Sequence, residues 1–118
     1  MTATKRKITT AILVSHNGMG HGDVELQHKL IQSYLRLLQE GNNLPDAMGF
    51  YTEGVMLLVA GSPVLDLLQS FEQEGVLLIA CSTCLGYYGL EDKLEVGIVG
   101  HMSDMIEIQN RYDKVITI

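Results

Sequence analysis

The stretch SPVLDLLQSFEQEGVLLIAC, residues 62–81, sets the fold class. Ser62 and Pro63 are typical of a helix start, and Gly75 is typical of a helix end. Between them apolar residues recur at helical spacing, namely Val64, Leu67, Leu68 and Phe71. The run VLLIA that follows is apolar without alternation, which indicates a strand buried on both faces. The stretch therefore predicts a helix over 62–75 with a buried strand directly behind it, the repeating unit of α/β proteins.

The same alternation of strands and helices continues on both sides of this stretch. The predicted order is strand 7–15, helix 24–40, strand 47–51, helix 62–75, strand 76–80, strand 95–99, helix 103–112 and strand 114–118. Asp23 and Ser103 are the expected N-caps, and residues 53–61 fit either a strand or an extended connection. The pattern favours an α/β fold, a three-layer α/β/α sandwich with a mainly parallel, flavodoxin-like five-stranded sheet. We expect residues 1–118 to form this single domain.

The apolar surface of the chain predicts association between copies. The helix over 24–40 has its predicted apolar face at Leu26, Leu30, Tyr34, Leu37 and Leu38. Hydrophobic residues make up 47% of the chain and its mean hydropathy is +0.17. This is more apolar surface than one small sheet covers, so we expect a homo-oligomer.

Charge and the length of the apolar runs exclude two classes of partner. Fourteen acidic residues against 8 basic ones give a net charge of -6, which opposes binding to a phosphate backbone. The basic residues 5–7 precede an apolar run, AILV, which is too short for a signal peptide and has no cleavage site after it. No apolar run approaches the roughly 18 residues of a membrane span. We therefore expect a cytoplasmic protein, in a compartment that keeps thiols reduced, with no nucleic-acid or membrane partner.

Polar and reactive residues follow the predicted strands directly. His16 and Asn17 follow the first strand, Cys81 follows the third, and His101 follows the fourth. Parallel sheets carry their sites at the carboxyl ends of the strands. With the flavodoxin-like strand order 2-1-3-4-5, these residues would open onto one crevice. We assign His16, Asn17, Gly18 and His101 as candidate binding residues.

The glycine-rich segment GMGHG, residues 18–22, resembles a phosphate-binding loop only in part. Its spacing is G-x-G-x-G instead of G-x-G-x-x-G, and no lysine follows as in a P-loop. The segment is typical of a turn, and we expect no cofactor.

The pair Cys81 and Cys84 is the only C-x-x-C motif and contains both cysteines of the chain. The pair can be buried structure, half of a zinc site, a thiol–disulfide redox pair or a sulfur-handling site. A zinc site lacks its second half, so we expect no metal. A thioredoxin-like arrangement needs a proline that follows the motif, whereas both prolines precede it. Two thiols at the end of a strand favour a working site.

Several ordered motifs resemble the DsrE/DsrF-like family, and most closely the DsrE-like domain of YedF-type proteins. They are GMGHGDVEL, FYTEGVMLLVAGSPVLDLL, CSTCLGYYGL and VGIVGHMSDMIEI, which together span nearly the whole chain. Two positions depart from the family pattern: Ser82 replaces the glycine of a CGTC motif, and His101 replaces an asparagine.

The resemblance implies a sulfur-relay or sulfurtransferase-like protein. By its spacing to Gly89, Cys81 matches the cysteine that carries sulfane sulfur as a persulfide, and Cys84 matches the second cysteine of the motif. The implied partners are sulfur donor and acceptor proteins, including TusA-like ones, because the TusA-like domain common in YedF-type proteins is not part of this sequence. Another reading is a non-catalytic oligomeric module with structural cysteines.

Overall fold

The computed structural model describes residues 8–118, so the basic segment 5–7 lies outside the described part. In chain order the elements are β1 (Thr10–Val14), α1 (Val24–Glu40), β2 (Ala47–Phe50), the 3₁₀ helix η1 (Thr52–Leu58), α2 (Leu65–Gln73), β3 (Leu77–Cys81), α3 (Ser82–Tyr87), β4 (Ile98–Gly100), α4 (Met102–Arg111) and β5 (Lys114–Thr117). None of the helices in the described part of the chain has the length and apolarity that crossing a membrane requires.

The five strands form one sheet in the order β4-β3-β2-β1-β5, and every neighbouring pair is parallel. The expected parallel five-stranded sheet is confirmed. The strand order 2-1-3-4-5 was wrong, because β2 lies between β1 and β3. The first three connections each step to the neighbouring position in one direction, and only the last runs back across the sheet to the far side of β1.

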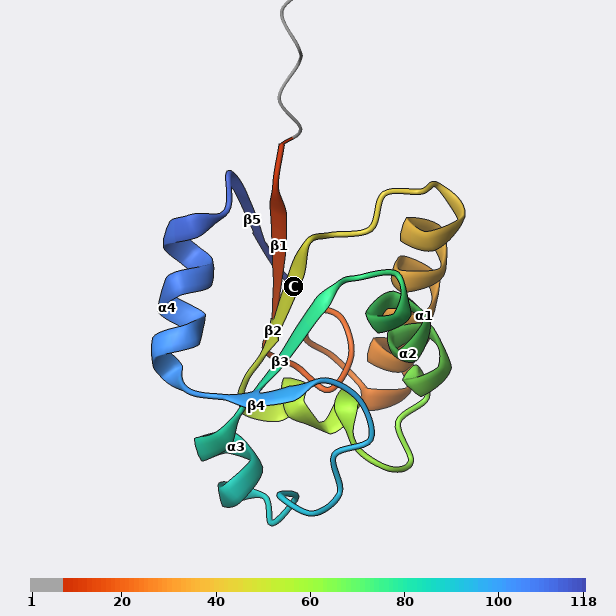
Figure 1. Cartoon of the computed structure of the whole chain (residues 1–118). Helices are drawn as coiled ribbons and strands as arrows, with labels where there is room; N and C mark the ends of the chain where they lie inside the picture. The colour runs from red at the N-terminus through yellow and green to blue at the C-terminus, as the bar shows by residue number, and fades with distance from the viewer. Residues whose placement is uncertain (1–7) are drawn as a thin grey trace, which may run out of the picture.

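This winding decides which face each helix covers. Crossovers between parallel strands are right-handed, so connections that step in opposite directions lie on opposite faces. Helices α1 and α2 accordingly lie on one face and α4 on the other, while α3 lies beyond the carboxyl end of β3 (Figure 1). The three-layer α/β/α sandwich is confirmed.

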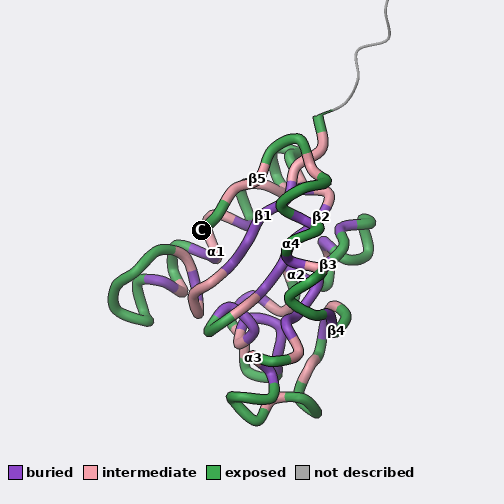
Figure 2. Tube along the Cα trace, turned by 90° about the vertical axis from the view of Figure 1, so that its left-hand side faces the viewer, coloured by how far each residue is buried: buried purple, intermediate pink, exposed green. Residues whose placement is uncertain are grey.

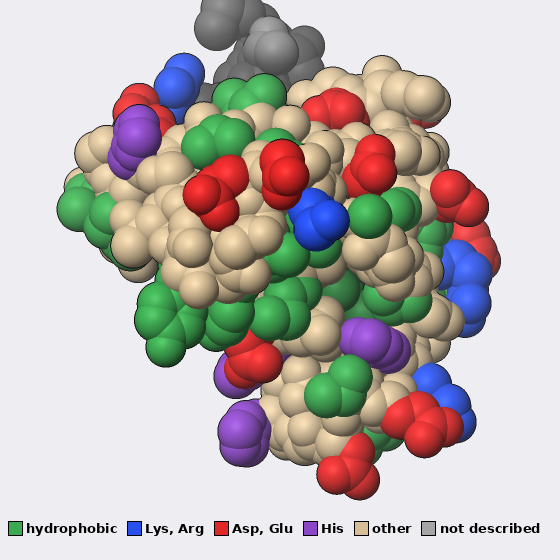
Figure 3. All heavy atoms as spheres, turned by 90° about the horizontal axis from the view of Figure 1, so that it is seen from below, with side chains coloured by type: hydrophobic (Ala, Val, Ile, Leu, Met, Phe, Trp, Pro, Cys, Tyr) green, Lys and Arg blue, Asp and Glu red, His purple; other side chains and the backbone are tan. Residues whose placement is uncertain are grey.

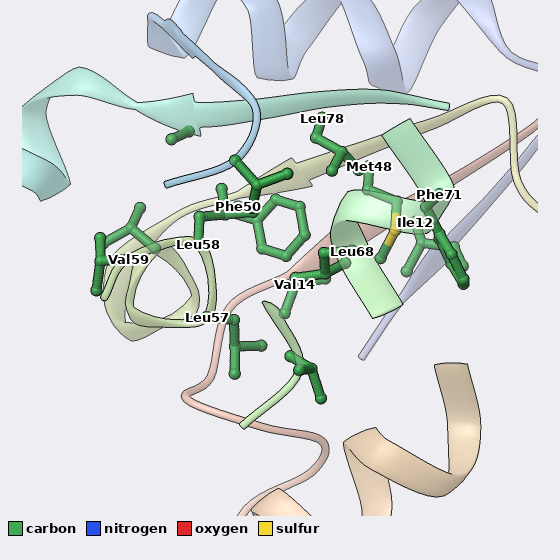
Figure 4. Packing of buried hydrophobic residues seen from close by; sticks show 14 of the residues in the cluster. Ile12, Val14, Met48, Phe50, Leu57, Leu58, Val59, Leu68, Phe71 and Leu78 are labelled. Atoms are coloured by element: carbon green, nitrogen blue, oxygen red, sulfur yellow. The ribbon is translucent and has the colours of Figure 1, made fainter. Parts of the chain in front are cut away.

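Buried residues run along the strands (Figure 2), and the buried apolar ones form a cluster on each face of the sheet. On the face with α1, α2 and η1, Phe50 packs among Val14, Leu58 and Leu68 (Figure 4). The smaller cluster on the other face consists of Ala11, Leu13, Ala47, Ile79, Met105 and Ile108. Because apolar residues of each inner strand contribute to both clusters, the strands carry unbroken apolar runs.

Helix α1 has the predicted bounds, but the sheet buries a different face of it. Ile31 and Leu35 are buried, whereas Leu26, Leu30 and Leu37 remain exposed. The loop before the helix fixes this rotation by hydrogen bonds to the inward-facing Gln27. Met19 N–H donates to the Gln27 carbonyl at 3.1 Å, and Gln27 Nε2 donates to the Gly22 carbonyl at 2.6 Å.

Two helix starts differ from those predicted. Helix α2 begins at Leu65, because Ser62 Oγ accepts the Val64 N–H at 3.2 Å and so caps a preceding turn instead of the helix. Helix α4 begins at Met102 with His101 as its N-cap, and the His101 N–H donates to the Asp104 carboxylate at 2.7 Å. His101 therefore has a structural role that Ser103 was expected to have.

Candidate functional site

The candidate site lies at the carboxyl edge of the sheet, the lower end of the molecule in Figure 1. Seen from below, this end has histidine and acidic side chains among apolar ones (Figure 3). All five parallel strands end here, and the first four lead into the loop before α1, η1, α3 and α4. The polar groups of these connections are the ones that the fold brings together.

The two cysteines are free thiols at the junction of β3 and α3. Cys81 is the last residue of β3 and the N-cap of α3, and its side chain is 1% exposed within the larger apolar cluster. Cys84 lies on the first turn of α3 and is half-buried. The two thiols are close enough for Cys81 to influence the pKa of Cys84. The pair is thus preassembled, with Cys84 on the side nearer to solvent.

Thr52 joins the end of β1 to the cysteine pair. Its backbone N–H donates to Cys84 Sγ at 3.0 Å, and its Oγ1 donates to the Ser15 carbonyl at 2.8 Å. Thr52 was not among the site residues predicted from the sequence. The signal for it was available, because Thr52 is a polar residue that directly follows the predicted strand 47–51.

The surroundings of Cys84 favour its neutral form. Burial raises the pKa of the Cys84 thiol above its ordinary value, and the neighbouring Cys81 thiol raises it further. The Thr52 N–H acts in the opposite direction and lowers the pKa. Cys84 therefore stays protonated to a higher pH than an ordinary thiol.

The histidines predicted for the site lie at its margins. His101 Nδ1 is 3.0 Å from the Ser82 hydroxyl, so His101 reaches the cysteine loop through Ser82. The ring of His16 lies 5.8 Å from the ring of His21, within the loop that follows β1. Since β2 separates β1 from β3, the expected crevice with His16 and Cys81 on adjacent strands was wrong.

The two other predicted binding residues have different surroundings. Gly18 has a φ of +142°, and a Cβ at this position would overlap the backbone of Gln27, so its role is close packing against α1. Asn17 Oδ1 is 3.4 Å from His28 Nε2. Asn17 and His28 line a hollow of about 320 Å³. Tyr88, one helical turn beyond Cys84, lines the same hollow.

Comparison with known proteins places the chain in a family. The model of the DsrE/DsrF-like family matches residues 11–118, which is nearly the whole chain. The chain belongs to the DsrE/DsrF-like family. No curated protein matches it.

Two solved structures have a fold similar to that of this chain. The ychN protein from E. coli is 18% identical with a TM-score of 0.68. The protein MTH1491 from Methanobacterium thermoautotrophicum, described as of unknown function, is 20% identical with a TM-score of 0.71. Each comparison covers 95% of this chain and 100% of the other chain. At these identities the likeness concerns the fold.

The DsrE/DsrF-like chain brings no candidate metal ligands together in its described part. Among residues 8–118, no three side chains of His, Cys, Asp or Glu are grouped so that they could hold an ion. Cys81 and Cys84 alone supply two of the four ligands of a structural zinc site. The chemistry available at the site is therefore that of two neighbouring thiols, one backbone N–H donor and the Ser82–His101 pair.

Proposed function

We propose that this DsrE/DsrF-like protein carries sulfane sulfur as a persulfide on Cys81 and passes it to a partner protein. The observation that carries the proposal is the position of two neighbouring free thiols at the carboxyl end of β3, the edge at which parallel sheets carry their sites. Family membership supports the sulfur-relay context.

Loading is a thiol exchange on a donor persulfide. The Cys81 thiolate attacks the outer sulfur of R–S–SH, a bond forms between Cys81 Sγ and that sulfur, and R–S⁻ leaves. Cys81 then holds –S–SH, and an acceptor thiolate removes the outer sulfur by the same exchange. The role of Cys84 is that of a resolving thiol. Its thiolate attacks the Cys81 Sγ, closes a Cys81–Cys84 disulfide and releases HS⁻.

Burial of Cys81 favours a second candidate function. A thiol that is 1% exposed and packed in the apolar cluster also suits a non-catalytic oligomeric module with structural cysteines. Alkylation of the folded protein separates the two functions, because a structural pair resists the reagent while a working pair reacts, first at the half-buried Cys84.

The test of the proposed function is intact mass after incubation with a sulfane-sulfur donor. We expect a gain of one sulfur atom that a reductant removes and that prior alkylation prevents. Protein unfolded in denaturant with the same donor is the control for nonspecific thiol exchange. A chain that gains no sulfur, with both thiols resistant to alkylation, is the structural module.

We also propose that the protein is a homo-oligomer and that its sulfur partners are separate proteins, TusA-like ones among them. The exposed Leu26, Leu30 and Leu37 form an apolar stripe along α1, which supports association. Light scattering at micromolar concentration is expected to give a mass above that of one chain. Leu30→Glu is expected to reduce that mass. Gln32→Glu, which adds the same charge at a half-buried position outside the stripe, is not expected to reduce it. A monomer in all three cases contradicts the proposal.

A further inference from the structure

Thr52 has a backbone conformation that its side chain disfavours. Its φ is +46°, in the left-handed region. Among the described residues other than glycine, Asn42 alone shares a positive φ, and asparagine tolerates that region. A β-branched residue there is strained, and such strain persists where the surroundings impose it.

Contacts on both sides of Thr52 impose this conformation. The Tyr51 N–H donates to the Val14 carbonyl at 3.1 Å, and the Thr52 hydroxyl donates to the neighbouring Ser15 carbonyl at 2.8 Å. Gly54 then packs directly on the Val14 carbonyl, with its N–H donated to the Tyr51 carbonyl at 2.9 Å. The chain after β2 is thereby held against the end of β1.

The strained turn keeps one peptide N–H directed at a sulfur atom. The positive φ lets the chain turn into η1 immediately after the Tyr51–Thr52 peptide, whose N–H lies 3.0 Å from Cys84 Sγ. A hydrogen bond from an N–H group to a thiolate is charge-assisted and stronger than one to the neutral thiol. The bond therefore favours the form of Cys84 that attacks.

We propose that Thr52 is a positioning residue: its hydroxyl, fixed on the Ser15 carbonyl, holds its own N–H on Cys84 and so sets how readily Cys84 resolves a persulfide on Cys81. This inference rests on the proposed function for the persulfide step alone. In that step the Cys84 thiolate bonds to Cys81 Sγ, the bond between Cys81 Sγ and the outer sulfur breaks, and HS⁻ leaves with the electron pair.

The test is the titration of Cys84 in a Cys81→Ser chain. The readout is the dependence of the alkylation rate on pH. Other groups that face Cys84 are residue 81 on the same turn and the Tyr88 phenol, which experiences the charges of Cys84 and Glu53. These groups stay constant across the variants. Thr52→Val removes the hydroxyl at nearly equal volume and is expected to move the titration midpoint up by about one pH unit.

Two matched variants keep the result specific. Thr52→Ser retains the hydroxyl and is expected to titrate close to the parent chain. Thr83→Val removes an exposed hydroxyl one residue from Cys84 and is expected to leave the midpoint in place. If Thr52→Val does not fold, Thr52→Gly replaces it, because glycine accepts the positive φ and still lacks the hydroxyl. The same upward shift is then expected.

A folded Thr52→Val or Thr52→Gly chain that titrates like the parent overturns the inference, as does an equal shift in Thr83→Val. The titration needs no sulfur donor, so this outcome is independent of whether the protein carries persulfide. Where loading is observed, release of HS⁻ from the loaded Thr52→Val chain, with Cys81 intact, is expected to be several-fold slower than from wild type at one pH.

Discussion

Cys81→Ser is expected to abolish persulfide loading, while Cys84→Ser loads and keeps its sulfur longer than the wild type. Cys81 ends a buried strand and is held by the packing around it, whereas Cys84 lies in the first turn of a six-residue helix and is half-buried. A rigidly positioned thiol is the better acceptor. Serine cannot form a persulfide, so the mass gain disappears in the first variant.

The second variant removes the resolving step. Without the Cys84 thiol no internal disulfide can close, and HS⁻ is not expelled from the loaded chain. We expect the half-life of the loaded form to lengthen by at least about tenfold without acceptor. Mass spectrometry of both variants after identical loading measures this. Sulfur retained by Cys81→Ser, or failure of Cys84→Ser to load, reverses the two roles.

The pH dependence of sulfur loss provides an independent check on Cys84. Burial and the neighbouring Cys81 thiol raise the pKa of the Cys84 thiol, so the thiolate that attacks is scarce at neutral pH. Below the raised pKa the persulfide persists, and its loss accelerates by about tenfold per pH unit as that pKa is approached. The rise is expected at higher pH than for an ordinary thiol, and it is expected to be absent in Cys84→Ser.

The sequence was sufficient to predict the five strands, three of the helices and the class of fold, but it missed α3 and left open the type of the segment that forms η1. Unbroken apolar runs bounded by glycine predicted β3 correctly, and Asp23 with Gly41 predicted the bounds of α1. These signals are local, because caps and periodicity act within one or two turns of chain. The position of Cys81 at the carboxyl edge followed from the same pattern and is confirmed.

Features that depend on contacts between distant segments could not be predicted in this way. Strand order is set by how successive crossovers pack, and alternation alone is compatible with several orders. Helix α1 has two apolar stripes, and the hydrogen bonds of Gln27 with the loop before it select the inner one. Thr52 acquires its role from Ser15 and Cys84, which lie 37 and 32 residues away in the chain.

The site also depends on a glycine whose replacement is expected to have the largest effect on stability. Gly54 lies in η1, and a Cβ at this position would overlap the carbonyl oxygen of Val14. The obstructing atom is backbone at the end of an inner strand, so a side-chain rotation cannot relieve the overlap. Either η1 or the end of β1 has to move.

Gly54→Ala is therefore expected to lower the free energy of unfolding by about 3 kcal/mol, measured by urea denaturation. Gly86→Ala is the matched control, because Gly86 lies in α3 with open space around it and its replacement is expected to be neutral or slightly stabilising.

Movement of η1 also draws the Thr52 N–H away from Cys84, so the remaining folded Gly54→Ala protein is expected to show a higher titration midpoint for Cys84. An unfolding free energy equal to that of wild type contradicts the close packing of Gly54 on Val14. Reduced stability with an unchanged Cys84 titration shows that the close packing supports the fold without setting the position of the Thr52 N–H.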